Sequence, residues 1–279
     1  MLMLSAMIAV YGCDGSSGYQ RNSGTGWHYD DAVFTPHDPA TFQPLGKYFG
    51  HDSQQGYCRG TAVEGSDGAT FEALSDHEAR DQHSVYYCDT YRKSQEYWAY
   101  QHLRISVIAG ADAATYSSLA YGYARDRHRA YDRGEPFAVR DALSFEPLSR
   151  RFARDAQRGY FAHVEIPGSH GPSFSLLLED EGYARDHRQA WHGFIEVNKP
   201  NHEPYPVIRS LRGADLNTLR ALGRDYAVDA QQVWFQGTPL PQADAASFTV
   251  RSVMAGSVDA QDRSNLWQQG RIVSTPSAR

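Results

Sequence analysis

The chain has 279 residues, of which 41% are hydrophobic and 13% aromatic. This composition excludes an intrinsically disordered protein and supplies enough apolar material for one large domain or two smaller ones. The formal net charge of −6 argues against a nucleic-acid-binding protein, which usually carries a basic face.

The N-terminal residues resemble a secretory signal that ends in a lipidated cysteine. Residues 1–10 are apolar and uncharged, and such a run is too short to span a bilayer. Val10, Gly12 and Cys13 fit the pattern of a bacterial lipobox. We therefore expect residues 1–13 to be a signal peptide with lipid on Cys13. The alternative is an ordinary buried N-terminal strand or helix.

The residues after this cysteine suggest where the protein is located. Residues 14–18 are polar and small, as an anchored domain needs for its tether. Asp14 resembles the Gram-negative signal for retention in the inner membrane, which predicts a lipid-anchored protein facing the periplasm. Cys58 and Cys88 are the remaining cysteines. In an exported protein they could form a disulfide or stay as two separate thiols, and their spacing does not decide between these.

The chain from about residue 19 to 273 repeats one pattern with a period of about thirty residues. In each copy an Asp is followed five residues later by Tyr or Trp, and the residue two before the Asp is Ala in six copies. Two steps between copies are longer, which marks two insertions. The Asp and aromatic pairs are Asp52/Tyr57, Asp81/Tyr86, Asp126/Tyr131, Asp155/Tyr160, Asp186/Trp191, Asp229/Trp234 and Asp262/Trp267, with Asn22/Trp27 as a degenerate first copy.

A second element recurs between the copies. It reads Asp, two variable residues, Thr or Ser, an aromatic residue or Leu, two more residues and Leu, as in DGATFEAL at 67–74 and DALSFEPL at 141–148. The Asp carboxylate can cap a short turn by accepting backbone N–H groups. We expect the aromatic residue and the Leu to be anchors of the core.

These elements predict a mainly β fold. Short β-favouring runs bounded by Asp, Asn and Gly indicate two to three antiparallel strands per unit, with a turn or 3₁₀ segment at the Asp-x-x-Thr element. One unit cannot bury its own aromatic face, so neighbours must stack. We expect about eight β-hairpin or meander repeats over residues 19–273, in an elongated or curved array, and a tail at 274–279. A closed propeller is the weaker alternative, because its blades usually need about forty residues.

The repeat resembles the DKNYY family of bacterial envelope proteins. That pattern reads Tyr-Ala-Lys-Asp-Lys-x-x-Val-Tyr-Tyr-x-Gly, followed by an apolar residue and Asp-Pro-x-Thr-Phe-x-x-Leu. YARDRHRAYDRG (123–134) and YAVDAQQVWFQG (226–237) match it well. The second Tyr of the pair drifts most, since Asp132 and His192 stand at that place in two copies. The resemblance covers nearly the whole chain, and it implies the architecture more firmly than any one activity.

The repeated residues have both functional and structural interpretations. A ladder of Asp could bind Ca²⁺, but the residues that follow are not further carboxylates, so a turn-forming role is favoured. Aromatics at fixed spacing could stack on sugars, but every unit has them, so an inter-repeat core is favoured. The twelve histidines give no metal-binding spacing, and no nucleophile, phosphate-loop or dinucleotide motif is present. We therefore predict no enzyme, no cofactor and no metal site.

The two insertions are the candidate binding regions, because the repeat positions build the scaffold. The first, residues 89–106, combines aromatic and basic side chains in the manner of interface anchors. The second, residues 193–213, is rich in Pro. The alternative is that both are longer hairpins that pack on their own units. The candidate partner-binding residues are Tyr91, Arg92, Tyr97, Trp98 and Tyr100.

These features predict a periplasmic, lipid-anchored binding protein that touches the membrane only through its anchor. Some proteins similar to this one accompany secreted effectors, so the resemblance implies an immunity protein that neutralises a cognate toxin, for example a type VI secretion phospholipase, by steric occlusion. Its partner would be a secreted hydrolase. The alternative is a structural or adhesive envelope lipoprotein that binds glycan or another envelope protein.

Overall fold

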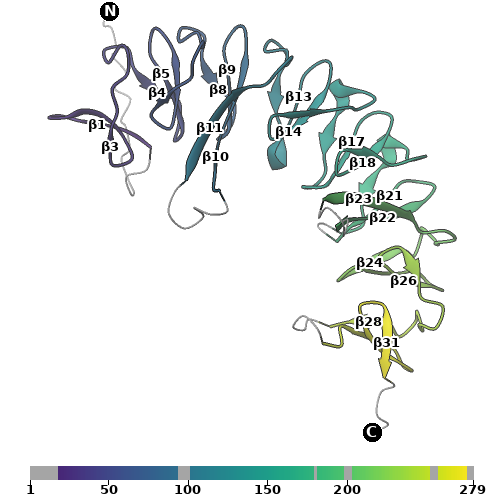
Figure 1. Cartoon of the computed structure of the whole chain (residues 1–279). Helices are drawn as coiled ribbons and strands as arrows, with labels where there is room; N and C mark the ends of the chain where they lie inside the picture. Colours follow the sequence, from purple (N-terminus) through teal and green to yellow (C-terminus); the bar gives the residue numbers. More distant parts are fainter. Residues whose placement is uncertain (1–17, 94–100, 179–180, 198–202, 252–256, 275–279) are drawn as a thin grey trace, which may run out of the picture. The chain divides into compact units, whose positions relative to one another are not determined.

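The computed structural model describes residues 18–93, 101–178, 181–197, 203–251 and 257–274, and these form short antiparallel strands gathered in eight separate sheets (Figure 1). The prediction of a mainly β repeat fold is confirmed. No sheet in this part of the chain closes into a barrel. The chain divides into two compact units, residues 1–114 and 115–279.

The first unit holds sheets 1 to 3, each a simple up-and-down meander in sequence order. Its strands are β1 (Tyr19–Asn22), β2 (Gly26–Tyr29) and β3 (Ala32–Val33) in sheet 1; β4 (Gln43–Pro44), β5 (Phe49–His51), β6 (Gly56–Cys58) and β7 (Thr61–Ala62) in sheet 2; and β8 (Glu72–Ala73), β9 (Glu78–Arg80), β10 (Val85–Tyr91) and β11 (His102–Val107) in sheet 3.

The second unit holds sheets 4 to 8, again as meanders. Its strands are β12 (Ser117–Ser118), β13 (Tyr123–Arg125), β14 (Ala130–Asp132) and β15 (Glu135–Phe137) in sheet 4; β16 (Glu146–Pro147), β17 (Phe152–Arg154), β18 (Gly159–Phe161) and β19 (Val164–Glu165) in sheet 5; β20 (Ser175–Leu176), β21 (Tyr183–Arg185), β22 (Ala190–Val197) and β23 (Pro204–Ser210) in sheet 6; β24 (Arg220–Gly223), β25 (Tyr226–Val228), β26 (Val233–Phe235) and β27 (Thr238–Pro239) in sheet 7; and β28 (Thr249–Val250), β29 (Ala260–Gln261), β30 (Leu266–Gln268) and β31 (Arg271–Ser274) in sheet 8.

The number of strands per sheet differs from the expectation of two to three, because seven of the eight sheets have four. Several of the outer strands, such as β8 and β19, are only two residues long. Such a run is too short for side-chain alternation to be recognised in the sequence. Two 3₁₀ turns, η3 (Ala142–Ser144) and η4 (Gly171–Ser173), lie at the Asp-x-x-Thr position as expected, whereas η2 (Ala120–Gly122) precedes β13.

The repeated Asp is a buried hydrogen-bond acceptor that joins three parts of its sheet. In sheet 5, Oδ1 of Asp155 accepts the backbone N–H groups of Gln157 and Arg158, each at 2.7 Å, and so closes the turn between β17 and β18. Its Oδ2 accepts the hydroxyl of Tyr160 at 2.5 Å and the N–H of Asp141 at 2.9 Å. The same pair of backbone bonds to Oδ1 forms at Asp52, Asp81, Asp126, Asp186, Asp229 and Asp262.

The Thr or Ser of the Asp-x-x-Thr element binds to this turn. It thereby fixes the loop that leads into the first strand of each sheet, which we call the entry loop. In sheet 3, Oγ1 of Thr70 donates to Asp67 Oδ2 at 3.0 Å and accepts the N–H of Gln82 at 3.1 Å. Only a hydroxyl can serve as donor and acceptor at once here, which accounts for Thr or Ser at this position. The equivalent N–H bond is accepted by Thr41, Thr115, Ser144, Ser173, Thr218 and Ser247.

Within each unit, aromatic side chains fill the space between successive sheets. The ring of Phe71 packs so closely on Gly56 that a Cβ there would lie 2.3 Å from it, and Phe174 packs on Gly159 in the same way. The seven repeat aromatics from Tyr57 to Trp267 are each at most 3% exposed. These rings are therefore core, as expected, and are not presented to sugars.

The free energy of unfolding tests the role of the repeat carboxylate. We expect Asp81→Ala to lower it by roughly 3 kcal/mol, because the donors that Asp81 satisfies lose their acceptor inside the core. Asp76→Ala is the matched control, since this exposed Asp lies just before β9 in the same sheet; it should change the value by less than about 0.5 kcal/mol. Urea denaturation measures both, and equal losses would contradict the assignment.

The pH dependence of stability follows from the same network. Burial alone would raise the pKa of the Asp81 carboxyl, but its hydrogen bonds from Asp67, Tyr86 and the turn outweigh burial and lower it. The pKa values of Asp52, Asp155 and Asp262 are lowered likewise. The native state thus binds protons more weakly than the unfolded chain, so stability should be lost as the pH falls below about 4.

The pKa of the aromatic partner of this carboxylate shifts in the opposite direction. Burial and the bond to Asp81 raise the pKa of Tyr86 to about 12, so its contribution is present below pH 10 and lost as the pH rises toward 12. Denaturation midpoints measured across the pH range should therefore fall at both ends. In Asp81→Asn the denaturation midpoint should fall less steeply at low pH. An unchanged fall would count against the carboxylate as the titrating group.

Candidate functional site

Both insertions occupy the same place in the repeat. In five sheets the third and fourth strands are joined by a two-residue turn with positive φ at both residues, a type I′ geometry. These turns are Arg59–Gly60, Arg133–Gly134, Ala162–His163, Gln236–Gly237 and Gln269–Gly270. In sheets 3 and 6 the insertions replace this turn and lengthen both strands. They form hairpin 1 (β10 and β11) and hairpin 2 (β22 and β23), each visibly longer than the strands beside it (Figure 1).

Both faces of hairpin 1 are buried at its root, where Val85 and Tyr87 lie on the outer face, and this outer face becomes accessible from Asp89 onward. On the inner face, Leu103 and Ile105 pack against the core cluster of the first unit. On the outer face, His77 stacks on Tyr87 with 6.0 Å between ring centroids, and Tyr91 stacks on His102 at 5.3 Å. The expectation of longer hairpins that pack on their own units thus describes the base of the hairpin, while Tyr91 and Arg104 on its outer face are exposed.

The outer face of hairpin 1 carries aromatic and basic groups together. Tyr91 is 45% exposed and ends β10, and the exposed Arg92 follows it. The guanidinium of Arg104 lies 6.0 Å from the ring centroid of Tyr87. A nearby carboxylate, Asp89, lies 3.7 Å from Nδ1 of His77. This surface offers rigid rings, cationic groups and one acid within a small area.

The structure describes only some of the predicted partner-binding and lipidation residues. Tyr91 and Arg92 lie together at the end of β10. Tyr97, Trp98 and Tyr100, and also Cys13 with Asp14, lie outside the described residues.

Three residues of this outer face were missed by sequence reasoning. The alternating stretch HLRISV at 102–107 could have indicated His102 and Arg104. His77 could not have been found in this way, because it reaches Tyr87 only through the register of β9 and β10.

Cys58 of β6 and Cys88 of β10 form a disulfide in the structure, with 6.7 Å between their Cα atoms. Both residues are fully buried. The bond joins sheet 2 to the root of hairpin 1, so it restrains the strand that carries the outer face.

Removal of this disulfide should destabilise the first unit. We expect Cys58→Ala/Cys88→Ala to lower the free energy of unfolding by roughly 3 to 4 kcal/mol, mostly through the freedom gained by the unfolded chain. Thermal denaturation with and without dithiothreitol measures this. Reductant should lower the melting temperature of the wild type and leave that of the double variant unchanged; insensitivity of the wild type would show that the bond does not form.

Hairpin 2 is anchored at its root to sheet 7. His192 is completely buried, and its Nε2 lies 3.4 Å from Oδ1 of Asp225. Burial opposes ionisation of Asp225, but interactions with His192 and Gln236 outweigh it and lower the pKa of this carboxyl. The guanidinium of Arg209 lies 4.8 Å from the centroid of Phe194 and donates to the Gln236 carbonyl at 3.2 Å. These contacts fix the direction in which β22 and β23 leave the sheet.

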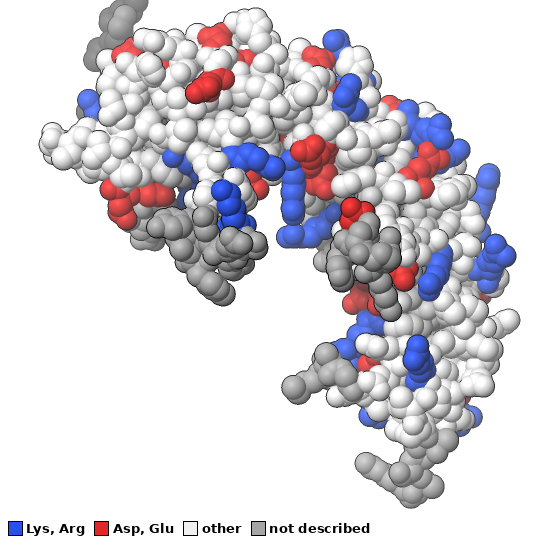
Figure 2. All heavy atoms as spheres, viewed as in Figure 1, with Lys and Arg blue, Asp and Glu red and all other residues white. Residues whose placement is uncertain are grey.

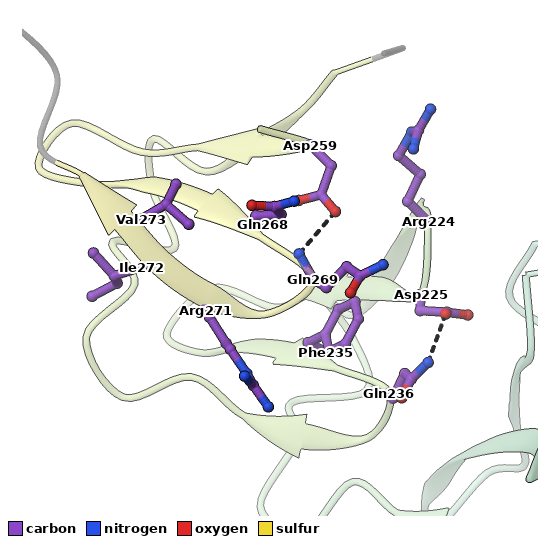
Figure 3. Close-up of a pocket in the computed structure, with 10 residues that line it drawn as sticks. All are labelled: Arg224, Asp225, Phe235, Gln236, Asp259, Gln268, Gln269, Arg271, Ile272 and Val273. Carbon is purple, nitrogen blue, oxygen red and sulfur yellow. Dashed lines mark hydrogen bonds between the residues drawn. The ribbon is translucent and has the colours of Figure 1, made fainter. Parts of the chain in front are cut away.

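A polar cleft of about 820 Å³ lies between sheets 7 and 8 (Figure 3). Asp259 accepts the N–H of Gln269 at 2.9 Å, and Asp225 accepts the side-chain amide of Gln236 at 2.9 Å. Arg271 reaches the cleft from β31. Both carboxylates are engaged by structural donors, so the cleft presents hydrogen-bonding groups rather than a prepared acid–base pair.

The carboxylates of the repeated Asp residues already accept hydrogen bonds from N–H and O–H groups of the protein. Both oxygens of Asp155, for example, accept N–H or O–H groups, which is incompatible with Ca²⁺ coordination by the same atoms. Within the described ranges, no group of three His, Cys, Asp or Glu side chains is placed to hold a metal ion. No helix in those ranges is long and apolar enough to cross a bilayer. Figure 2 shows charged side chains of both signs in small groups, separated by uncharged surface.

The comparison with known proteins agrees with this repeat architecture. The model of the DKNYY family matches residues 91–271, more than half of the chain. The chain belongs to the DKNYY family. No curated protein and no solved structure matches it. The family match begins at the end of β10, and Asp52 and Asp81 make the same bonds upstream of it, so the same hydrogen-bond pattern is present in sheets 2 and 3.

Proposed function

We propose that this protein is a lipid-anchored binding protein of the bacterial periplasm that neutralises a cognate secreted toxin by steric occlusion. The observation that carries this proposal is the outer face of hairpin 1, where Tyr91, Arg92 and Arg104 are exposed beside stacked rings. Tyr and Arg, with Trp, are enriched among interface anchors. They project from an insertion, not from a position that the repeat needs for its own folding.

The support beneath this face favours tight binding. The disulfide, the stacked pairs and the six-residue register between β10 and β11 restrain these two strands. A preorganised surface loses little conformational entropy when a partner docks, so more of the contact energy appears as affinity. Occlusion of an active site or of a substrate path needs no chemistry from this chain.

The toxin is proposed from the family resemblance, since some similar proteins accompany secreted effectors. The class we propose is a secreted hydrolase such as a type VI secretion phospholipase. Anchoring through Cys13 in the inner membrane would hold the inhibitor in the compartment that such an effector enters.

A structural or adhesive lipoprotein is the second candidate, and the polar cleft between sheets 7 and 8 favours it. Amides, carboxylates and arginines line this cleft beside Phe235. Such groups hydrogen-bond sugar hydroxyls, so a glycan would be the ligand in that case.

A capture experiment separates the two candidates. The full chain is used as bait in lysate of the source bacterium, and retained proteins are identified by mass spectrometry. We expect one stoichiometric secreted hydrolase whose activity falls when the chain is added. Tyr91→Ala and Arg104→Ala should each weaken the complex about tenfold or more, because truncation of an anchor costs over 1.4 kcal/mol.

Tyr121→Ala is the matched control, since Tyr121 has a similar exposure of 44% and lies in the other unit. It should leave the affinity unchanged. Retention of only glycan fragments or of general envelope proteins would refute the inhibitor function and favour the second candidate.

A further inference from the structure

The outer strands of the sheets differ in how much backbone they expose. In sheets 2, 5 and 7 the fourth strand has only two residues. Very short edges offer few groups for pairing with another chain. The insertions change this, because β11 has six residues and β23 has seven. Hairpins 1 and 2 therefore create two long edges.

The edge of β23 is blocked by proline. The N–H of Leu211 bonds to the carbonyl of Ala190, which sets the phase of the ladder. Because residues of an antiparallel strand alternate between facing the neighbour and facing away, Pro204 and Pro206 stand at positions that face away from β22. Proline has no N–H, so this edge lacks two of the donors that an added strand would need.

The edge of β11 is open. The N–H of Ile108 bonds to the carbonyl of Val85, so Leu103, Ile105 and Val107 present their N–H and C=O groups away from β10. The strand contains neither Pro nor Lys, the residues that commonly protect an edge. In the part of the chain that the structure describes, no strand pairs with this side of β11.

A groove of about 370 Å³ with a mixed lining of apolar and polar groups lies along the same edge. Leu103, Ile105 and Val107 line it together with Val63 and Tyr86. Thr61, Glu64 and Ser106 add polar groups to the lining. Val107 is 55% exposed although it is apolar. A strand placed beside β11 would direct every second side chain toward this groove.

The opposite face of β11 carries the exposed guanidinium of Arg104. His102 and Arg104 alternate with the groove residues along the strand. Among the described residues Arg104 forms no salt bridge, and its cross-strand neighbour Asp89 is instead placed near His77. The remaining side chains of an added strand would lie over these two basic positions.

We propose that the outer edge of β11 binds an extended segment of the partner protein as a fifth strand of sheet 3. Main-chain hydrogen bonds to Leu103, Ile105 and Val107 hold the segment, its apolar side chains enter the groove, and its alternate side chains are acidic and face Arg104. This is recognition by β-strand addition. It deepens the proposed function by giving the mode of attachment, and it rests on that function only for the existence of a protein partner.

The test uses a peptide library, so that it does not depend on the toxin. Random nine-residue peptides displayed on phage are selected on the full oxidised chain, and the enriched sequences are synthesised and measured by fluorescence anisotropy. We expect peptides in which apolar residues alternate with Asp or Glu. Val107→Pro removes an outward-facing N–H, as Pro204 and Pro206 do on β23, and should weaken their binding at least tenfold. Val107→Ala keeps the N–H and should weaken it less than threefold.

Several results would overturn this edge assignment. They are equal affinities for Val107→Pro and Val107→Ala, enriched peptides without the alternation, and a dimer in sedimentation that Val107→Pro dissociates, which would make a second copy the occupant. Circular dichroism confirms folding, and if Val107→Pro is unfolded, Leu103→Pro against Leu103→Ala tests the same edge.

The toxin capture distinguishes this proposal from the function it extends. A captured toxin that binds Val107→Pro as tightly as the wild type overturns the edge assignment and leaves the inhibitor function standing. Edge-dependent peptides without any captured toxin support the edge and refute the inhibitor function.

Discussion

One buried carboxylate per repeat is the constraint on which the structure depends. A carboxylate taken out of water costs several kcal/mol unless hydrogen bonds satisfy it. The protein meets this cost by supplying two N–H groups from the turn to one oxygen, and a core ring and the entry loop to the other, as at Asp155. Each donor must come from a defined position. The turn, the aromatic residue five positions on and the docked entry loop are therefore consequences of one group.

The local nature of this network explains what could be predicted. The Asp-to-aromatic spacing and the Asp-x-x-Thr element lie within short stretches of sequence, so they identified the repeat, the turn and the core rings. Features that join distant stretches could not be predicted in the same way. The pairing of Cys58 with Cys88 and the stack of His77 on Tyr87 depend on how the strands are aligned, which no single stretch encodes. Strands of two residues carry no periodicity at all.

The same network explains where the chain was lengthened. The turn between the second and third strands is tied to the repeat Asp, and the entry loop is tied to it through Thr or Ser. In sheet 5, where the turn between the third and fourth strands is Ala162–His163, the bonds to Asp155 come from the other turn, from Tyr160 and from the loop that precedes the sheet. An insertion between the third and fourth strands thus leaves the network whole, and both insertions lie there. Function is able to vary at the hairpins because the fold is maintained elsewhere.

A stack of small sheets has many strand edges, and each edge is a hazard for unwanted pairing. This protein limits the hazard with two-residue strands and with prolines on outer strands, at Pro44, Pro136, Pro147, Pro204, Pro206 and Pro239. Against that background β11 is an exception, with six residues and no proline. It is also the strand whose partner β10 carries the disulfide. An unprotected edge on a loosely held hairpin would invite aggregation, but on a restrained one it can select a segment whose side chains fit both faces.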